Sequence, residues 1–240
     1  MEGNLEKDFI QALNDAYEEY NKKGSRSNAR VKPTHSFIAN YLDSILNKDS
    51  NIKYKIYSLG VDDNKEYTID GKYYPKREDI VVLVNDKPIV AISFKFVASN
   101  YAQNSNNYFE NLLGETANIR LVNVGFAHLL ILRAHTPYYD KNLGNKRGNL
   151  IKTETLTEEH IEKYVKLFMD GDYPHKPDVL GILIVDDDKN NEHLVKADLK
   201  ALNFKDNIIE ILEKKLSVNN FFEKVIYLCR LRSWLTFQNI

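Results

Sequence analysis

Cysteine is almost absent from this chain of 240 residues, which contains a single one, Cys229, inside the apolar run IYLCRL. One thiol cannot form a disulfide within the chain, and the lack of cysteine pairs removes the usual ligand sets of structural zinc sites. We therefore expect a protein of a reducing compartment, the cytoplasm. Cys229 should be buried there as a small apolar side chain.

Long apolar runs are also missing, and none approaches the roughly 20 residues that span a bilayer. The first residues, MEGNLEKDF, are acidic and lack the apolar core of a signal peptide. The phosphate-binding pattern G-x-x-x-x-G-K-[ST] does not occur either. We expect a soluble protein with no membrane partner and no nucleotide cofactor.

The charges nearly cancel, because 33 lysine and arginine residues face 34 aspartate and glutamate residues. This balance does not exclude a nucleic-acid partner, since binding depends on basic residues gathered on one surface. The six histidines show no H-x-x-x-H spacing for a metal, and no G-x-S-x-G turn marks a serine nucleophile.

Hydrophobic periodicity predicts a chain that alternates helices with strands. We expect helices at 3–22, 35–47, 106–122, 157–169, 204–216 and 219–235, and strands at 52–59, 64–69, 80–84, 89–92, 127–134 and 178–185. Thr34 and Thr157 are candidate N-caps, and the polar segment 135–153 is interpreted as a loop. This order predicts one mixed α/β (α+β) domain, residues 1–240, with a central sheet covered by helices.

The segment 76–115 contains the residues on which a chemical site could be built. Two apolar runs flank the turn N-D-K-P and predict a β-hairpin, which Asp79 opens. Ser93 and Lys95 lie two apart on the second strand, so their side chains share one face. Glu110 follows on the next helix. Carboxylates that hold magnesium beside a lysine are what metal-assisted phosphodiester hydrolysis requires.

These residues resemble the PD-(D/E)XK nucleases, in which an aspartate opens one strand and a D/E-x-K lies on the next. Within them, DIVVLVNDKPIVAISFKF followed by NSNNYFENLLGETAN is similar to the XhoI-type restriction endonucleases. The resemblance spans residues 79–117. It implies a restriction-endonuclease-like mixed sheet flanked by helices, and a type II enzyme that cuts specific double-stranded DNA with Mg²⁺. The implied catalytic residues are Asp79, Ser93, Lys95 and Glu110, with Asp79 and Glu110 as the magnesium ligands.

The sequence departs from the family pattern at two positions. Glu78 rather than proline precedes Asp79, and Ser93 replaces the acidic residue of D/E-x-K. A serine hydroxyl carries no charge and is a poor magnesium ligand, so a carboxylate has to come from elsewhere. Glu110 is our candidate, and Glu115 is its rival. Two alternatives remain open: a structure-specific or repair nuclease of the same fold, and a catalytically inactive DNA-binding module.

Basic and amide side chains near this segment are candidates for contact with DNA. Lys76 and Arg77 precede Asp79 and could neutralise phosphates, and asparagine side chains pair well with adenine. The full set of candidates is Lys76, Arg77, Asn104, Asn106, Asn107, Arg133, Lys146 and Arg147. A two-fold symmetric DNA site would be matched by a homodimer.

Overall fold

The computed structural model describes residues 4–23, 30–48, 51–61, 65–140, 148–188, 190 and 193–238. The helices of these residues are α1 (Leu5–Lys23), α2 (Lys32–Leu46), α3 (Tyr101–Arg120), α4 (Glu158–Met169), α5 (Asp206–Lys214) and α6 (Val218–Gln238). The strands are β1 (Tyr54–Ser58), β2 (Tyr67–Asp70), β3 (Pro75–Glu78), β4 (Ile80–Val84), β5 (Lys87–Val97), β6 (Gly125–Arg133), β7 (His135–Tyr139), β8 (Leu150–Thr155), β9 (Val179–Asp187) and β10 (Leu194–Lys196). No helix within these ranges is long and apolar enough to cross a membrane.

A mixed sheet of six strands forms the centre, in the order β1-β4-β5-β6-β9-β10. β1, β4 and β5 pair antiparallel, β5, β6 and β9 pair parallel, and β10 is antiparallel to β9. Every residue of β6 is buried, as the continuous apolar run predicted for a central parallel strand. Two hairpins, β2-β3 and β7-β8, form separate small sheets.

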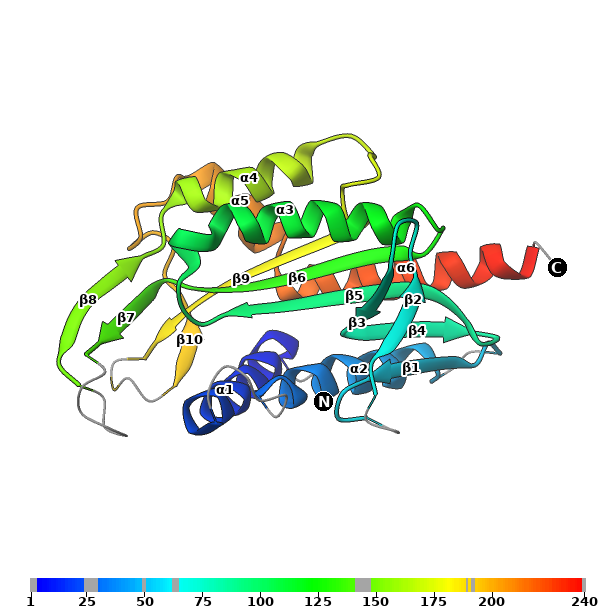
Figure 1. Cartoon of the computed structure of the whole chain (residues 1–240), viewed down its shortest axis with the longest axis horizontal. Helices are drawn as coiled ribbons and strands as arrows, with labels where there is room; N and C mark the ends of the chain where they lie inside the picture. Colours follow the sequence, from blue (N-terminus) through cyan, green and yellow to red (C-terminus); the bar gives the residue numbers. More distant parts are fainter. Residues whose placement is uncertain are drawn as a thin grey trace.

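Helices cover both faces of this sheet (Figure 1), with α1, α2 and α6 on one side and α3, α4 and α5 on the other. Side chains along β5 alternate between the two cores: Ile92 and Phe94 belong to the core under α1, α2 and α6, and Ala91 and Val97 to the other. Ser93 therefore faces α3, as do Ala91 and Lys95, which lie two residues away on the strand. The predicted fold class, a mixed sheet flanked by helices, is confirmed.

The predicted hairpin is formed by β4 and β5. Its two turn residues, Asn85 and Asp86, have φ angles of 51° and 58°. Positive φ at both central positions is the type I′ geometry that matches the twist of paired strands, and asparagine and aspartate tolerate it better than most residues. After a register shift between Val82 and Leu83, Ile80 lies opposite Ile92, which brings the start of β4 close to the middle of β5.

Two local predictions were wrong. Thr34 does not cap α2, because the helix already begins at Lys32, with a proline in its first turn. Proline is well tolerated there, and Thr34 is buried, with Oγ1 donating to the carbonyl oxygen of Val31 at 2.9 Å. The segment 135–153 is not all loop, since β7 and β8 pair across it. The prediction for Thr157 is confirmed, because this residue is the N-cap of α4, and Cys229 is buried as expected.

Candidate active site at a carboxylate cluster

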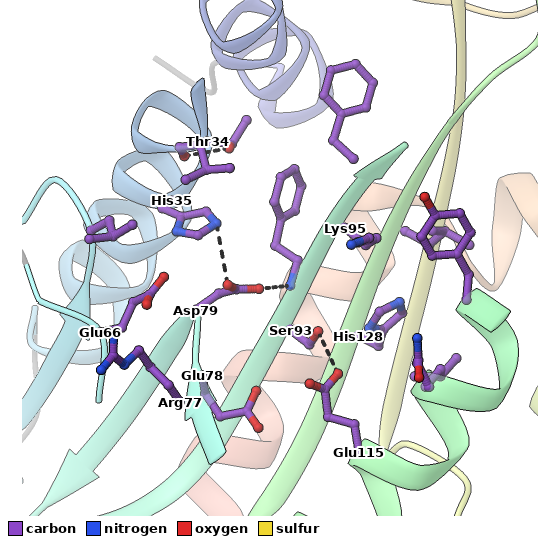
Figure 2. Close-up of a pocket in the computed structure, with 18 of the residues that line it drawn as sticks. Thr34, His35, Glu66, Arg77, Glu78, Asp79, Ser93, Lys95, Glu115 and His128 are labelled. Carbon is purple, nitrogen blue, oxygen red and sulfur yellow. Dashed lines mark hydrogen bonds and ion pairs between the residues drawn. The ribbon is translucent and has the colours of Figure 1, made fainter. Parts of the chain in front are cut away.

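A cavity of about 530 Å³ opens where the junction of β3 and β4 meets β5, α2 and α3. Its walls carry the carboxyl groups of Glu66, Glu78, Asp79 and Glu115, together with Lys95. Figure 2 shows Glu66 on one side of Asp79, and Glu78 and Glu115 on the other. Four carboxyl groups in a partly buried site repel one another, so this cavity has the character of a cation site.

Asp79 lies at the bend where the chain leaves the β2-β3 hairpin and enters the central sheet. Glu78 still pairs with Tyr67 of β2, and Ile80 already pairs with Ile92 of β5. The backbone N–H of Phe94 donates to Asp79 Oδ2 at 2.8 Å and fixes the carboxylate. Burial raises the pKa of Asp79 to about 6, and this hydrogen bond only partly opposes the rise.

Ser93 orients a carboxylate instead of supplying one. Its Oγ donates to Glu115 Oε2 at 3.2 Å, and the other oxygen of Glu115 forms an ion pair with the Lys76 ammonium group. Glu115 also adds to the rise in the pKa of Asp79, so the two carboxylates act on each other electrostatically. The hydroxyl at position 93 thus holds Glu115 in a defined orientation beside Asp79.

Glu110 does not reach this cavity, although it was our candidate ligand. It is exposed and is not among the described residues that line the cavity. Its charge acts instead on Lys163 of α4, where it opposes the lowering of the lysine pKa by burial. Five residues along a helix correspond to a rotation of about 140°, so Glu110 and Glu115 face different sides of α3. The geometry therefore favours the rival, Glu115.

Lys95 lies on the same wall as Ser93, as the strand period predicted. Its side chain is exposed, and the ammonium group lies 5.2 Å from the centre of the Tyr108 ring. An aromatic face holds a cation in place without neutralising it. Lys95 thus presents a positive charge at the solvent side of the carboxylates.

Glu78 and His128 are buried residues of the site that the sequence did not reveal. Glu78 is only 1% exposed, and Oε1 has no hydrogen-bond partner among the described residues. Burial, and after it the Glu115 charge, raises the pKa of Glu78 to about 8. His128 lies opposite Ser93 on β6, and burial lowers its pKa to about 4, so the ring is neutral. No local signal pointed to Glu78, because β3 is a short strand of mixed polar residues and was not predicted.

The candidate DNA contacts on β3 and α3 differ in their position relative to the cavity. Lys76 and Arg77 line it. The three asparagines of α3 do not: Asn104 donates to the carbonyl oxygen of Asn100, Asn106 accepts from Lys163, and Asn107 is exposed. Of these five candidates, the two basic residues of β3 are the ones placed beside the carboxylates.

Arg133 is buried, and its Nη2 lies 2.5 Å from Asp187 Oδ2. The prediction that Arg133 contacts DNA is therefore not supported, because the guanidinium group is enclosed and already paired. It ends β6, where the next residues turn away into β7. Two further candidates, Lys146 and Arg147, lie outside the described residues.

Comparisons with known proteins add little to this geometry. No protein-family model matches the chain, and no curated protein matches it either. Among solved structures, the chain is similar to the small subunit of the heterodimeric restriction endonuclease R.BspD6I, with 13% identity and a TM-score of 0.31. The match covers 92% of this chain and 98% of that subunit. A likeness at this score carries no argument, so any assignment of function depends on the residues of the cavity.

Proposed function

We propose that this protein is a magnesium-dependent endonuclease of restriction type that hydrolyses phosphodiester bonds in double-stranded DNA. One observation carries the proposal: Asp79, Glu115 and Lys95 line a single cavity beside the β4-β5 hairpin. These are the two carboxylates and the lysine that the resemblance to XhoI-type enzymes calls for, with Glu115 in the role first given to Glu110.

The donor set fits magnesium. This ion prefers oxygen ligands and is usually held by one or two carboxylates, with water completing its shell. Asp79 and Glu115 would hold it, and the unpartnered Oε1 of Glu78 is a third oxygen donor within the same cavity. Burial first, and the neighbouring Glu115 charge after it, raise the pKa values of Glu78 and Asp79. A bound divalent ion would supply charge neutralisation and a water of lowered pKa.

The protein's own groups position the reactants around these carboxylates. Ser93 holds Glu115 by a hydrogen bond, and the Phe94 N–H holds Asp79. Lys76 forms an ion pair with Glu115. Once a bound metal ion neutralised the Glu115 carboxylate, the Lys76 ammonium group would be free to contact a phosphate. Lys95, at the solvent side, would orient the attacking water and offset charge on the phosphate.

Double-stranded DNA is the proposed partner, with Lys76 and Arg77 as the phosphate contacts beside the cavity. A homodimer is proposed on symmetry, because each subunit would then cut one strand of a two-fold symmetric site. Arg77 is exposed at the cavity edge, where a phosphate could approach it without disturbing the core.

The proposal is tested by incubating the protein with plasmid DNA and Mg²⁺, and in parallel with Mg²⁺ and excess chelator. Discrete fragments that need Mg²⁺ and disappear in Lys95→Ala are the expected result. Lys166→Ala is the matched control, because Lys166 is an exposed lysine on α4 that is not among the described residues lining the cavity. Nicking without discrete fragments would indicate a structure-specific nuclease. Tight DNA binding without any cleavage would refute the catalytic assignment.

A further inference from the structure

A second group of potential ligands lies on the α2 side of Asp79, away from Glu115. His35 of α2, Glu66 just before β2, and Asp79 each offer one ligand atom, and these three atoms lie within 4.8 Å of one another. Figure 2 shows the imidazole of His35 and the carboxyl group of Glu66 converging on Asp79. The group shares only Asp79 with the proposed magnesium site.

His35 is the unusual member, because it is a buried polar side chain without a hydrogen bond. The residue is 1% exposed, and Nδ1 has no partner in the described part of the chain. Nε2 faces Asp79 Oδ1 across 4.0 Å, which is too long for a hydrogen bond. The ring stands edge-on to Phe94, with centroids 5.7 Å apart, so packing fixes its direction. Nε2 is thus the nitrogen aimed at the group, and a ring nitrogen of a buried side chain left there without a hydrogen bond calls for a reason, of which binding of an ion is a usual one.

The charge state of the group suits an ion. Burial lowers the pKa of His35 to about 4, so its ring is neutral at neutral pH and keeps a free lone pair. Burial and the nearby Asp79 raise the pKa of Glu66, which shows that the two carboxylates repel each other. A divalent cation between them would remove that repulsion, and neutral imidazole would be the third ligand.

We propose that His35, Glu66 and Asp79 form a binding site for a transition-metal ion of the Mn²⁺, Co²⁺ or Zn²⁺ class. Imidazole nitrogen suits these ions, whereas Mg²⁺ prefers a shell made of oxygen alone. Ligand atoms about 2.1 Å from a tetrahedral ion lie about 3.4 Å apart. No pair therefore has to close by more than about 1.4 Å, and the Glu66 side chain is partly exposed and has room to rotate.

An ion at this place would tie α2 and the segment before β2 to the bend at Asp79. It would thereby stabilise the folded protein, in proportion to the logarithm of the metal concentration above Kd. This inference does not depend on hydrolysis of DNA, since the site is built from residues on the other side of Asp79 from Glu115.

The test is a titration of the full chain with Co²⁺ in the absence of DNA, followed by visible absorption and by calorimetry. We expect the parent to bind Co²⁺ and to keep it in an excess of Mg²⁺. Loss of even an outer partner of a metal ligand commonly costs about 10–100-fold in affinity, so His35→Gln and Glu66→Gln should weaken binding by about 100-fold or more. Glu115→Gln should still bind Co²⁺, and Glu110→Gln, an exposed control, should leave Co²⁺ affinity unchanged.

A parent that binds no Co²⁺, or a Glu66→Gln variant that binds like the parent, would overturn the inference. Loss of Co²⁺ binding in Glu115→Gln but not in Glu66→Gln would place the ion in the other site and overturn it as well. Circular dichroism checks the fold of His35→Gln. If His35→Gln is unfolded, the Co²⁺ affinity of Glu66→Gln alone decides the test. Cleavage of plasmid in Mg²⁺ is a separate readout, so this site and the proposed nuclease activity can fail independently.

Discussion

Replacement of Glu78 by glutamine should stabilise the metal-free protein, and the gain should grow with pH. Glu78 is buried and Oε1 has no hydrogen-bond partner among the described residues. Burial is the main cause, and the Glu115 charge the next, of a rise in the pKa of Glu78 from 4.5 to about 8. Between pH 4.5 and about 8, Glu78 keeps its proton in the folded protein and releases it in the unfolded chain.

The two pKa values of Glu78 set the size of the stability that the protein loses as pH rises. Below pH 4.5, Glu78 is protonated in both the folded and the unfolded state, and its burial then costs no stability through ionisation. As pH rises from 4.5 to about 8, the stability should fall by about 1.4 kcal/mol per pH unit, and then level off. The loss reaches about 3 kcal/mol at pH 7, and about 5 kcal/mol once Glu78 ionises in the folded state. Glutamine keeps the volume of the side chain and removes this cost.

Urea unfolding of the parent and of Glu78→Gln, each with a chelator present, measures the effect at about pH 5, 7 and 8.5. The variant should be similar to the parent at the lowest pH and clearly more stable at the highest. Glu110→Gln serves as the control, because an exposed carboxylate should change stability by less than about 0.5 kcal/mol at any pH. A difference that stays constant with pH, or a variant that is less stable at pH 8.5, would refute the reasoning.

Three other perturbations probe the same cavity and its surroundings. Added Mg²⁺ should raise Tm more at pH 8 than at pH 5.5, because Asp79, with a pKa of about 6, is mostly protonated at the lower pH; equal shifts would contradict this. Ser93→Ala should weaken Mg²⁺ binding about fivefold in calorimetry, since Glu115 loses a hydrogen bond worth about 1 kcal/mol; unchanged affinity would argue against an orienting role. Arg133→Ala should lower the free energy of unfolding by about 3 kcal/mol, because Asp187 loses its buried partner, while DNA affinity in a filter-binding assay should not change.

The central elements of the fold could be predicted because their signals are local. The continuous apolar runs that became β6 and β9, and the Asn85-Asp86 turn, need no information from distant residues. The β7-β8 hairpin could not be found in this way. Its strand Leu150–Thr155 is exposed at most positions, so it has no buried face to impose an alternation of apolar and polar residues.

The site was predictable only where the strand period defined it. Ser93 and Lys95 had to share a face because they lie two apart on β5. The choice between the glutamates of α3 depended on which side of the helix packs on the sheet. A usable signal existed, since Leu112, Glu115 and Ile119 follow the spacing of one helix face, and Leu112 and Ile119 are buried.

The other members of the site come from segments that only the folded chain brings together. His35 lies on α2 and Glu66 before β2, and no spacing in the sequence relates them to Asp79. Glu78 was considered only as a departure from the family pattern. Its burial depends on β3, a short strand of mixed polar residues that carries no hydrophobic period.

The central claim is that the carboxylate of Glu115, together with Asp79 and Lys95, forms the catalytic site for DNA hydrolysis. The most direct measurement compares plasmid cleavage in Mg²⁺ by Glu115→Gln and by Glu110→Gln, two equal substitutions on the same helix. The geometry predicts that Glu115→Gln loses cleavage by about 100-fold or more while it stays folded, as loss of a transition-state contact would cause. Glu110→Gln should cleave like the parent. An active Glu115→Gln with an inactive Glu110→Gln would contradict the claim.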